Sequence, residues 1–474
     1  MDKIAKEMRV RFCEFEQGHV FKFWEILTED ERIELLQQAR QIDLEYLSRI
    51  IRSVLHERRV DPGFLAGIQP AKFIKFPNSE IDLLQCEDVI RLGEQKIRSG
   101  QVAIFTAAGG YSTRLGCSMP KGMVPITPIK NKSLFQVFAE KILAAEKRYE
   151  QRFHWIILTS DKTHNETIEF FGRNNSFGIG NVHFIKQGLM PAIDHGGRII
   201  METRNRIAMH PDGHGGALKA LGQSGTLAML ENAGVDTLSY FQVDNPLAHC
   251  VDPYLIGIHL KNRAQITSRT VKKSYPEEKV GVFCEYDGKS YVVEYLDLPK
   301  EYAVARTATG ELQFCAGNVA IHVFDVQFIK RFHGANIQSE IPYHMAMKVI
   351  PTIDNLGEPF TPNVPNGIKL EMFIFDAFPF ADHSVVVESD RSEVFSPVKN
   401  IDGVDSPKTC KQDQLRLFAH WLLEAGADIP VDATGLPPFD IEISPTFADN
   451  EGDFLKKWAK LEHKPAIGPG QYIE

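Results

Sequence analysis

Apolar residues in the first hundred positions recur every three or four residues, which is the spacing of an amphipathic helix. One such stretch extends from Leu35 to Leu55, and a second covers residues 81–97. Thr28 precedes the first stretch and is followed three positions later by Glu31, the spacing of a helix capping box. The pattern predicts a helical N-terminal lobe over residues 1–70.

Near residue 100 the pattern changes, and short apolar runs begin to alternate with amphipathic stretches. The runs cover residues 102–106, 155–159, 182–185 and 238–243. Apolar strands that alternate with helices predict an α/β fold with a parallel sheet covered on both faces. In such sheets ligands bind beyond the carboxyl ends of the strands, which is where the polar motifs of this chain lie.

The part of the chain after residue 266 is richer in strands. Residues 279–286 and 289–295 flank Asp287-Gly288, a two-residue signal for a β-hairpin. Beyond residue 385 come a loop rich in Pro, Asp and Ser, a helix near 415–424 and a Pro-rich tail. The expected domains are a helical N-terminal lobe at 1–70, a catalytic domain at 71–385 and a small C-terminal lobe at 386–474.

Composition excludes several classes of protein. The 474 residues carry a formal net charge of −9, whereas a nucleic-acid-binding surface needs a basic face. The seven cysteines are scattered without CxxC spacing, which is typical of a reducing compartment. The N-terminus lacks the apolar core of a signal peptide, and no stretch has the length of a membrane span. We expect a cytoplasmic protein without nucleic-acid or membrane partners, and a monomer by default.

The most informative segment begins where the first apolar run ends, at Ala107-Ala-Gly-Gly-Tyr-Ser-Thr-Arg-Leu-Gly. Gly109 and Gly110 allow backbone N–H groups to approach a nucleotide. Arg114 offers a planar fork to phosphate oxygens, and Lys121 adds a second cation. The alternative is an ordinary turn with two surface cations. Two cations after a buried strand favour a phosphate loop, although neither a Walker A motif nor a GxGxxG fingerprint is present.

The loop pattern GG-x-x-TRLG-x-x-x-PKGM resembles the signature of the UDP-sugar pyrophosphorylases, most closely the eukaryotic-type UDP-N-acetylglucosamine pyrophosphorylases. The likeness continues in register from about residue 70 to about 400. Matching blocks include Lys186-Gln-Gly-Leu-Met-Pro-Ala, His210-Pro-Asp-Gly-His-Gly-Gly, Gln242-Val-Asp-Asn-Pro, Cys315-Ala-Gly-Asn and Phe395-Ser-Pro-Val-Lys-Asn. The resemblance implies a Rossmann-like α/β/α nucleotidyltransferase core with N- and C-terminal additions.

On the nucleotide side, the resemblance implies that Gln187 reads the uracil edge, because its amide both donates and accepts hydrogen bonds. Gly213 would lie beside the base or ribose. Eukaryotic relatives usually have asparagine at the next position, and this chain has His214, which leaves the sugar preference open. The implied nucleotide-binding residues are Ala108, Gly109, Gly110, Gln187, Gly213 and His214.

Asp244 ends the apolar run 238–243, with Asn245 beside it. A carboxylate at a strand end is a suitable ligand for Mg²⁺, the hard cation that this chemistry requires between phosphates. The alternative is an aspartate that caps a turn before Pro246. The match to the family's Val-Asp-Asn sequence favours the metal role.

The remaining site residues are also implied by the resemblance. Lys399 would join Arg114 and Lys121 as a catalytic cation, approaching the phosphates from the opposite side. Lys369 is a further phosphate candidate, for which a solvated lysine is an equal alternative. The implied sugar-binding residues are Gly281, Glu294, Tyr295 and Asn318.

The implied reaction is an in-line attack of a sugar 1-phosphate oxygen on the α-phosphorus of UTP, which yields a UDP-sugar and pyrophosphate. N-Acetylglucosamine 1-phosphate is the favoured sugar substrate. One alternative is a UDP-glucose or broad-specificity UDP-sugar pyrophosphorylase. A glycosyltransferase would normally need a DxD motif, which Asp244-Asn245 lacks. A non-catalytic UDP-sugar-binding protein is disfavoured because Arg114, Lys121 and Asp244 are all present.

Overall fold

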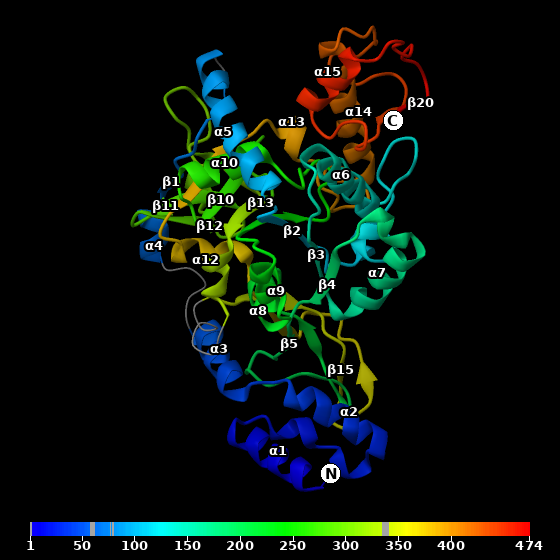
Figure 1. The fold of residues 1–474 in the computed structure, drawn as a ribbon. Helices are drawn as coiled ribbons and strands as arrows, with labels where there is room; N and C mark the ends of the chain where they lie inside the picture. Colours follow the sequence, from blue (N-terminus) through cyan, green and yellow to red (C-terminus); the bar gives the residue numbers. More distant parts are fainter. Residues whose placement is uncertain (1, 57–61, 76, 78–79, 334–340) are drawn as a thin grey trace. The chain divides into compact units, whose positions relative to one another are not determined.

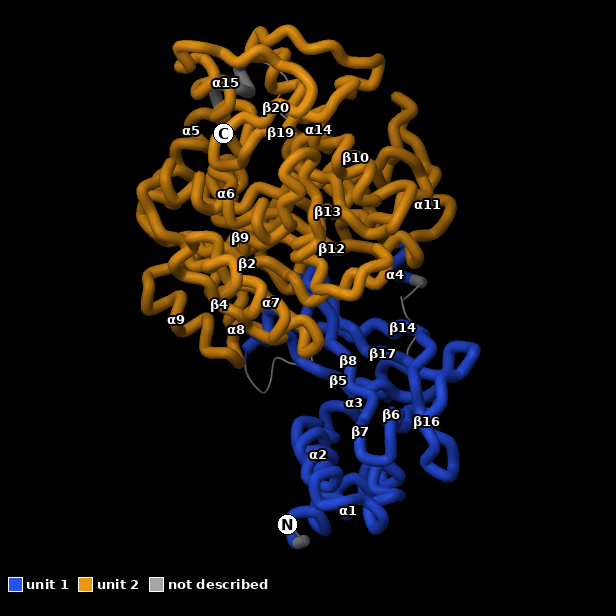
Figure 2. The backbone as a smooth tube through the Cα atoms, turned by 90° about the vertical axis from the view of Figure 1, so that its right-hand side faces the viewer, with its two compact units in different colours: residues 1–66, 187–220, 333–377 blue, residues 67–186, 221–332, 378–474 orange. Residues whose placement is uncertain are grey.

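The computed structural model describes residues 2–56, 62–75, 77, 80–333 and 341–474 (Figure 1). The chain forms two compact units, coloured separately in Figure 2. Unit 1 comprises Met1–Ala66, Gln187–Ala220 and His333–Ala377, and unit 2 comprises Gly67–Lys186, Leu221–Phe332 and Phe378–Glu474. The expected division at residues 70 and 385 stays a prediction.

Unit 2 is built on a ten-stranded sheet with the order β1-β11-β13-β9-β2-β3-β4, in which β10 pairs with β13 and β18, and β12 with β11. Strands β9, β2, β3 and β4 are parallel, as predicted, whereas β13 is antiparallel to β9. The strands are β1 (Gln69–Pro70), β2 (Val102–Ala107), β3 (Trp155–Thr159), β4 (Val182–Lys186), β9 (Thr237–Gln242), β10 (Ile266–Lys272), β11 (Val282–Tyr286), β12 (Lys289–Val293), β13 (Ala316–Asp325) and β18 (Ser384–Glu388).

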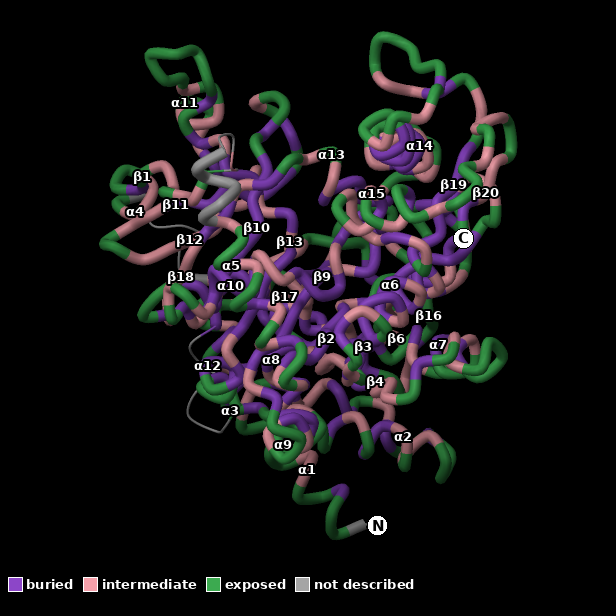
Figure 3. Tube along the Cα trace, turned by 45° about the horizontal axis from the view of Figure 1, so that its top comes forward, coloured by how far each residue is buried: buried purple, intermediate pink, exposed green. Residues whose placement is uncertain are grey.

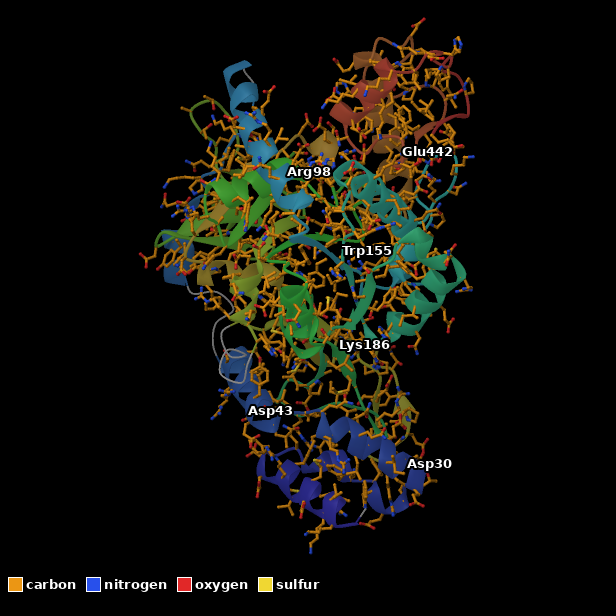
Figure 4. The ribbon with its side chains drawn as sticks, viewed as in Figure 1. Asp30, Asp43, Arg98, Trp155, Lys186 and Glu442 are labelled. Atoms are coloured by element: carbon orange, nitrogen blue, oxygen red, sulfur yellow. The ribbon has the colours of Figure 1, made fainter. Side chains whose placement is uncertain are left out.

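The central strands are buried along their length, as Figure 3 shows for β2 and β3. Strands covered on both faces read as continuous apolar runs, which is why the sequence located them correctly. Trp155, labelled in Figure 4, lies on β3 and donates its indole N–H to the Thr106 hydroxyl of β2 at 2.9 Å. This contact satisfies the one polar group of a fully buried aromatic side chain.

Helices connect and flank these strands. They are α5 (Glu80–Arg98), α6 (Leu134–Tyr149), α7 (Asp161–Arg173), α9 (Thr226–Asn232), α10 (Pro253–Lys261), α11 (Lys300–Val304), α12 (Val326–Lys330), α13 (Arg391–Val394), α14 (Pro407–Glu424) and α15 (Glu451–Ala459). Helix α14 begins well before the expected 415–424, because Ser406 caps it and Pro407 occupies its first turn. The Pro-rich tail also contains α15 and the parallel strands β19 (Ile441–Ile443) and β20 (Gln471–Ile473).

The predicted hairpin is confirmed: β11 and β12 pair antiparallel, and Asp287 and Gly288 have φ of 48° and 71°. Two successive positive φ angles are the requirement of a type I′ turn.

Unit 1 begins with the predicted helices, α1 (Asp2–Glu14), α2 (Glu29–Arg40) and α3 (Leu44–His56), and the capping box of Thr28 and Glu31 is present. The helices share a core with residues distant in sequence, including Ile193, Ile207 and Ile368. Its strands form two-stranded sheets, β5 (Leu189–Pro191) with β8 (Met209–Pro211), β6 (Met201–Thr203) with β7 (Arg206–Ile207), β14 (His344–Lys348) with β17 (Gly367–Glu371), and β15 (Thr352–Ile353) with β16 (Pro359–Phe360).

Two further helices, α4 (Pro62–Gly67) and α8 (Gly216–Gln223), contain boundaries between segments of the two units. Of the helices in the described part of the chain, none combines the length and apolarity that crossing a bilayer requires.

Candidate functional site

The predicted phosphate loop leaves the sheet at the carboxyl end of β2. The N–H of Ala108, which is buried, donates to the Leu158 carbonyl of β3 at 2.8 Å and fixes the start of the loop. Gly110 is exposed, and a side chain there would meet no described heavy atom within 4 Å. The backbone at Gly109 and Gly110 can therefore be approached closely by an anionic ligand.

The loop folds back so that Lys121 returns to the glycines. The Lys121 N–H donates to the Gly110 carbonyl at 3.0 Å. Within the loop, Ser112 donates both its N–H and its hydroxyl to the Met119 carbonyl, at 2.9 and 2.7 Å. These internal bonds give the loop a defined shape before any ligand binds.

Two residues of the loop differ in how they are held. Arg114 is exposed on the 3₁₀ helix η3 (Ser112–Leu115) and forms no ion pair with another described residue. Gly122 lies in η4 (Lys121–Met123), where a Cβ would overlap the Phe135 ring. This close packing against Phe135 requires glycine at the position.

Asp244 lies just beyond β9, at the same edge of the sheet as the phosphate loop. Ala107 of β2 pairs with Gln242 of β9, so the two loops that follow are neighbours. The Lys121 ammonium is 3.3 Å from Asp244 Oδ2, and the two side chains are 19% and 11% exposed. Lys121, a predicted catalytic cation, and Asp244, the predicted metal ligand, are thus in contact at the strand ends where the sequence placed the polar motifs.

Lys399 is tied to the same edge through the backbone. The N–H of the preceding residue, Val398, donates to the Asp244 carbonyl at 2.8 Å. The Lys399 Nζ lies 5.8 Å from the centre of the Phe395 ring. Unit 2 therefore assembles Lys121, Asp244 and Lys399 from three separate segments.

Asp405 is a charged neighbour that the sequence did not indicate. Burial raises the pKa of its carboxyl group, the adjacent Lys399 opposes the rise, and Glu278 and Asp244 add to it. Its carbonyl accepts the N–H groups of Lys399 and Asn400 at 2.6 and 3.0 Å. In the sequence it is one of several acidic residues in a loop, and nothing there connects it with Lys399.

The predicted sugar-binding residues flank the β11–β12 hairpin, with Gly281 before β11 and Glu294 and Tyr295 after β12, except Asn318, which lies on β13. The Asn318 N–H donates to the Gly281 carbonyl at 2.8 Å, and a side chain at Gly281 would meet the Glu294 carboxylate. Asn318 Oδ1 accepts the Ala320 N–H at 2.9 Å, which orients the amide. Gly281, Glu294 and Asn318 are therefore neighbours, and Tyr295 follows Glu294 in a half-buried position.

The predicted nucleotide-binding residues Gln187 and Gly213 belong to unit 1. Strand β5 pairs with β8 so that Leu189 faces Pro211, and the Gly188 carbonyl accepts the Asp212 N–H at 3.0 Å. Gln187 and Gly213 therefore lie at the same end of this two-stranded sheet.

Gly213 occupies a position that only glycine fits. Its φ is +87°, and a Cβ would overlap the Met372 backbone. Hydrogen bonds on both sides, from the Gly215 N–H to the Met372 carbonyl at 2.8 Å and from the Met372 N–H to the Asp212 carbonyl at 2.7 Å, hold the two segments together.

His214 has a defined orientation. Its Nδ1 accepts the Ile374 N–H at 3.2 Å, and its ring stacks on Phe373 with centroids 5.3 Å apart. Because Nδ1 accepts, the neutral ring carries its proton on Nε2, which makes that atom a hydrogen-bond donor. The side-chain amide of the usual asparagine also donates, so this substitution preserves donor chemistry.

Asp212, the residue before Gly213, was not singled out from the sequence. Its side chain is 2% exposed, and Oδ1 has no hydrogen-bond partner among the described residues. Burial raises the pKa of the Asp212 carboxyl group from 3.8 to about 6, although Lys219 opposes the rise. The signal for it was an aspartate set among glycines in His210-Pro-Asp-Gly-His-Gly-Gly.

Lys369 lies on β17, opposite Ala346 of β14. Its neighbours Ile368 and Leu370 are buried in the core of unit 1, so the alternation of a strand places Lys369 on the other face. Its phosphate role stays a prediction.

The described side chains provide no cluster of three His, Cys, Asp or Glu residues that could hold a metal ion. Asp244 is thus a single candidate ligand among the described side chains, and the ion's other ligands would have to come from outside them, as from the phosphates of a bound substrate.

Comparison with known proteins gives a consistent result. The profile of the UTP–glucose-1-phosphate uridylyltransferase family matches residues 68–409. The chain is 34% identical to UDP-N-acetylhexosamine pyrophosphorylase-like protein 1 of Xenopus tropicalis, over 93% of this chain and 91% of that protein. It is 33% identical to UDP-N-acetylglucosamine pyrophosphorylase of Saccharomyces cerevisiae, over 88% and 91%.

Solved structures agree. The uridine diphosphate N-acetylglucosamine pyrophosphorylase of Trypanosoma brucei is 28% identical and superposes with a TM-score of 0.82, over 99% of this chain and 98% of that one. A UDP-glucose phosphorylase of the same organism, at 15% identity and a TM-score of 0.59, shares the fold.

Proposed function

The chain belongs to the UTP–glucose-1-phosphate uridylyltransferase family, and from this premise we propose that it joins UTP to N-acetylglucosamine 1-phosphate, releasing pyrophosphate and UDP-N-acetylglucosamine. The choice of sugar follows from relatives named as UDP-N-acetylhexosamine or UDP-N-acetylglucosamine pyrophosphorylases, several of which are 32–34% identical over most of their length. The observation that carries the proposal is the convergence of Lys121, Asp244 and Lys399 at one edge of the sheet.

The reaction needs no general base, because the attacking phosphate oxygen is already anionic. The obstacle is the repulsion between two polyanions that must come within reach of each other. Lys121 and Arg114 are proposed to bind the triphosphate, and Lys399 to bind phosphate from the second loop. Fixed cations aimed at the leaving pyrophosphate stabilise the charge that develops there.

Asp244 is proposed to hold Mg²⁺ together with phosphate oxygens of the substrate, and the ion would neutralise charge on the phosphates. A single carboxylate at a strand end fits this role, since Mg²⁺ is usually held by one or two carboxylates plus substrate phosphates. Lys121 at 3.3 Å from Asp244 supports it, because a phosphate bound to Lys121 would also be within reach of an ion held by Asp244.

For recognition of the substrates, Gln187 is proposed to read the uracil edge, with Gly213 beside the base or ribose and His214 donating a hydrogen bond through Nε2. Gly281, Glu294, Tyr295 and Asn318 are proposed to bind the sugar. The mutual contacts of Gly281, Glu294 and Asn318 support a shared sugar site. A cytoplasmic monomer remains the expected form.

The direct test is release of pyrophosphate from UTP and N-acetylglucosamine 1-phosphate by the purified chain. A panel with the galactosamine, glucose and galactose 1-phosphates decides the sugar. Highest kcat/KM with N-acetylglucosamine 1-phosphate is expected. Preference for glucose 1-phosphate would instead support a UDP-glucose pyrophosphorylase, and no release with any sugar would refute the proposed reaction.

A further inference from the structure

Asn245, the residue after Asp244, has contacts that the proposed reaction does not explain. Its side chain is 3% exposed, and both ends of its amide are bonded. Nδ2 donates to the Val394 carbonyl at 2.7 Å, and Oδ1 accepts the Ser396 N–H at 3.0 Å. Because the amide N–H₂ has a carbonyl as its partner and the amide oxygen has an N–H group, the amide is fixed in one orientation.

The segment that Asn245 holds leads directly to Lys399. A third bond, from the Val398 N–H to the Asp244 carbonyl at 2.8 Å, continues the series. The three contacts fall on Val394, the last residue of α13, and on Ser396 and Val398 of the segment that follows it. All three residues are buried, so the segment has little freedom to shift along residues 244 and 245.

The loop that carries Asp244 is fixed from the other side as well. Lys141 of α6, only 7% exposed, donates to the carbonyls of Pro246 and Ala248 at 2.6 and 2.9 Å. Breaking either bond would leave a buried backbone carbonyl without a partner, which is unfavourable. The relative position of Asp244 and Lys399 therefore depends mainly on the hydrogen bonds between the two segments that carry them. Among the described residues, Asn245 is the only one whose side chain forms hydrogen bonds between residues 244–245 and 394–396.

We propose that Asn245 is a positioning residue that sets the separation between Asp244 and Lys399, so that both reach phosphate groups in the same substrate complex. The inference rests on the proposed function, because its readout is uridylyl transfer. It also explains why an amide stands beside Asp244: an aspartate in its place would turn a second acceptor toward the Val394 carbonyl.

The test is a double-mutant cycle of Asn245→Ala and Lys399→Ala, measured as kcat and KM for UTP and N-acetylglucosamine 1-phosphate. A residue that acts through Lys399 should matter only while Lys399 is present. We expect Asn245→Ala to lower kcat about 100-fold in the wild-type background, since small misplacements of reacting groups have effects of that order. In the Lys399→Ala background we expect a further change within about twofold.

Asn262→Ala is the matched control, because Asn262 also donates its Nδ2 to a backbone carbonyl, that of Ile258, at 2.8 Å in the same unit. It should leave kcat within about twofold of the wild type in both backgrounds. If Asn245→Ala does not fold, Asn245→Asp, which keeps the acceptor for the Ser396 N–H, replaces it in the cycle.

The outcomes separate the two proposals. If the wild-type chain transfers uridylyl groups and Asn245→Ala lowers kcat equally with and without Lys399, Asn245 is a structural brace and the inference is wrong while the proposed function stands. An equal loss in the Asn262→Ala control would also overturn it. If the wild-type chain shows no transfer, both proposals fail together.

Discussion

Replacing Asp212 with asparagine is expected to remove a pH-dependent loss of stability from unit 1. Burial raises the pKa of the Asp212 carboxyl group from 3.8 to about 6. Well below pH 3.8 the group is protonated in the folded and unfolded chains, and the native state has no penalty. As the pH rises toward 6, the Asp212 carboxyl group loses its proton in the unfolded chain before it does so in the folded chain. The native state therefore loses stability over this range, and the loss persists at higher pH. At about 1.36 kcal/mol per pKa unit, the loss is about 3 kcal/mol.

The assay is urea unfolding of the wild type and Asp212→Asn between pH 4 and pH 8, followed by intrinsic fluorescence. Subtracting the wild-type free energy of unfolding from that of the variant cancels the titration of every other group. This difference should rise by about 2 kcal/mol between pH 4 and pH 7 in favour of the variant, because part of the total change falls below pH 4. Asp30→Asn, at an exposed position on α2 labelled in Figure 4, should give a difference that is flat within about 0.5 kcal/mol. Parallel profiles for Asp212→Asn and the wild type would refute the reasoning.

Further predictions concern the phosphate loop and the metal ligand of unit 2, and His214 of unit 1. Lys121→Ala and Arg114→Ala should each lower kcat about 100- to 1,000-fold in steady-state assays while the chain still folds, and near-wild-type turnover in a folded variant would contradict their roles. Gly122→Ala should lower the free energy of unfolding by about 1–3 kcal/mol in urea titrations, because the new methyl group overlaps the Phe135 ring, whereas Gly110→Ala, which faces open space, should fold as well as the wild type. Treatment with EDTA should abolish turnover and added Mg²⁺ should restore it; turnover that persists after EDTA would exclude the metal role of Asp244. His214→Asn should retain kcat with N-acetylglucosamine 1-phosphate, because it retains a donor; a large loss would show that the imidazole has a role of its own.

The sequence predicted the central strands of unit 2 because they are buried on both faces and therefore stand out as continuous apolar runs. It also placed the motifs that contain Lys121 and Asp244 beyond the carboxyl ends of the strands, and parallel strands bring such loops to one edge. Both inferences use local pattern and a general rule of topology, and neither needs knowledge of long-range pairing.

Long-range pairing is what the sequence did not reveal. Unit 1 combines the N-terminal helices with strands near residues 190–210 and 344–371, through pairs such as β14 with β17 that no local periodicity announces. The same holds for individual contacts. In the sequence Asn245 served only to show that a DxD motif is lacking, and only the structure joins its amide to Val394 and Ser396.

The ion pair of Lys121 and Asp244 also suggests how the charged groups are kept in place between turnovers. Two charges that are 19% and 11% exposed would each be unfavourable without a partner, and together they neutralise each other across 3.3 Å. A triphosphate that arrives with its cation offers each side chain a new partner of the opposite sign, phosphate for Lys121 and the ion for Asp244. Substrate binding would then exchange one set of charge pairs for another rather than expose bare charges. Because the backbones of Asp244 and Lys121 are hydrogen-bonded to Val398 and Gly110, rotation of the two side chains would suffice for this exchange.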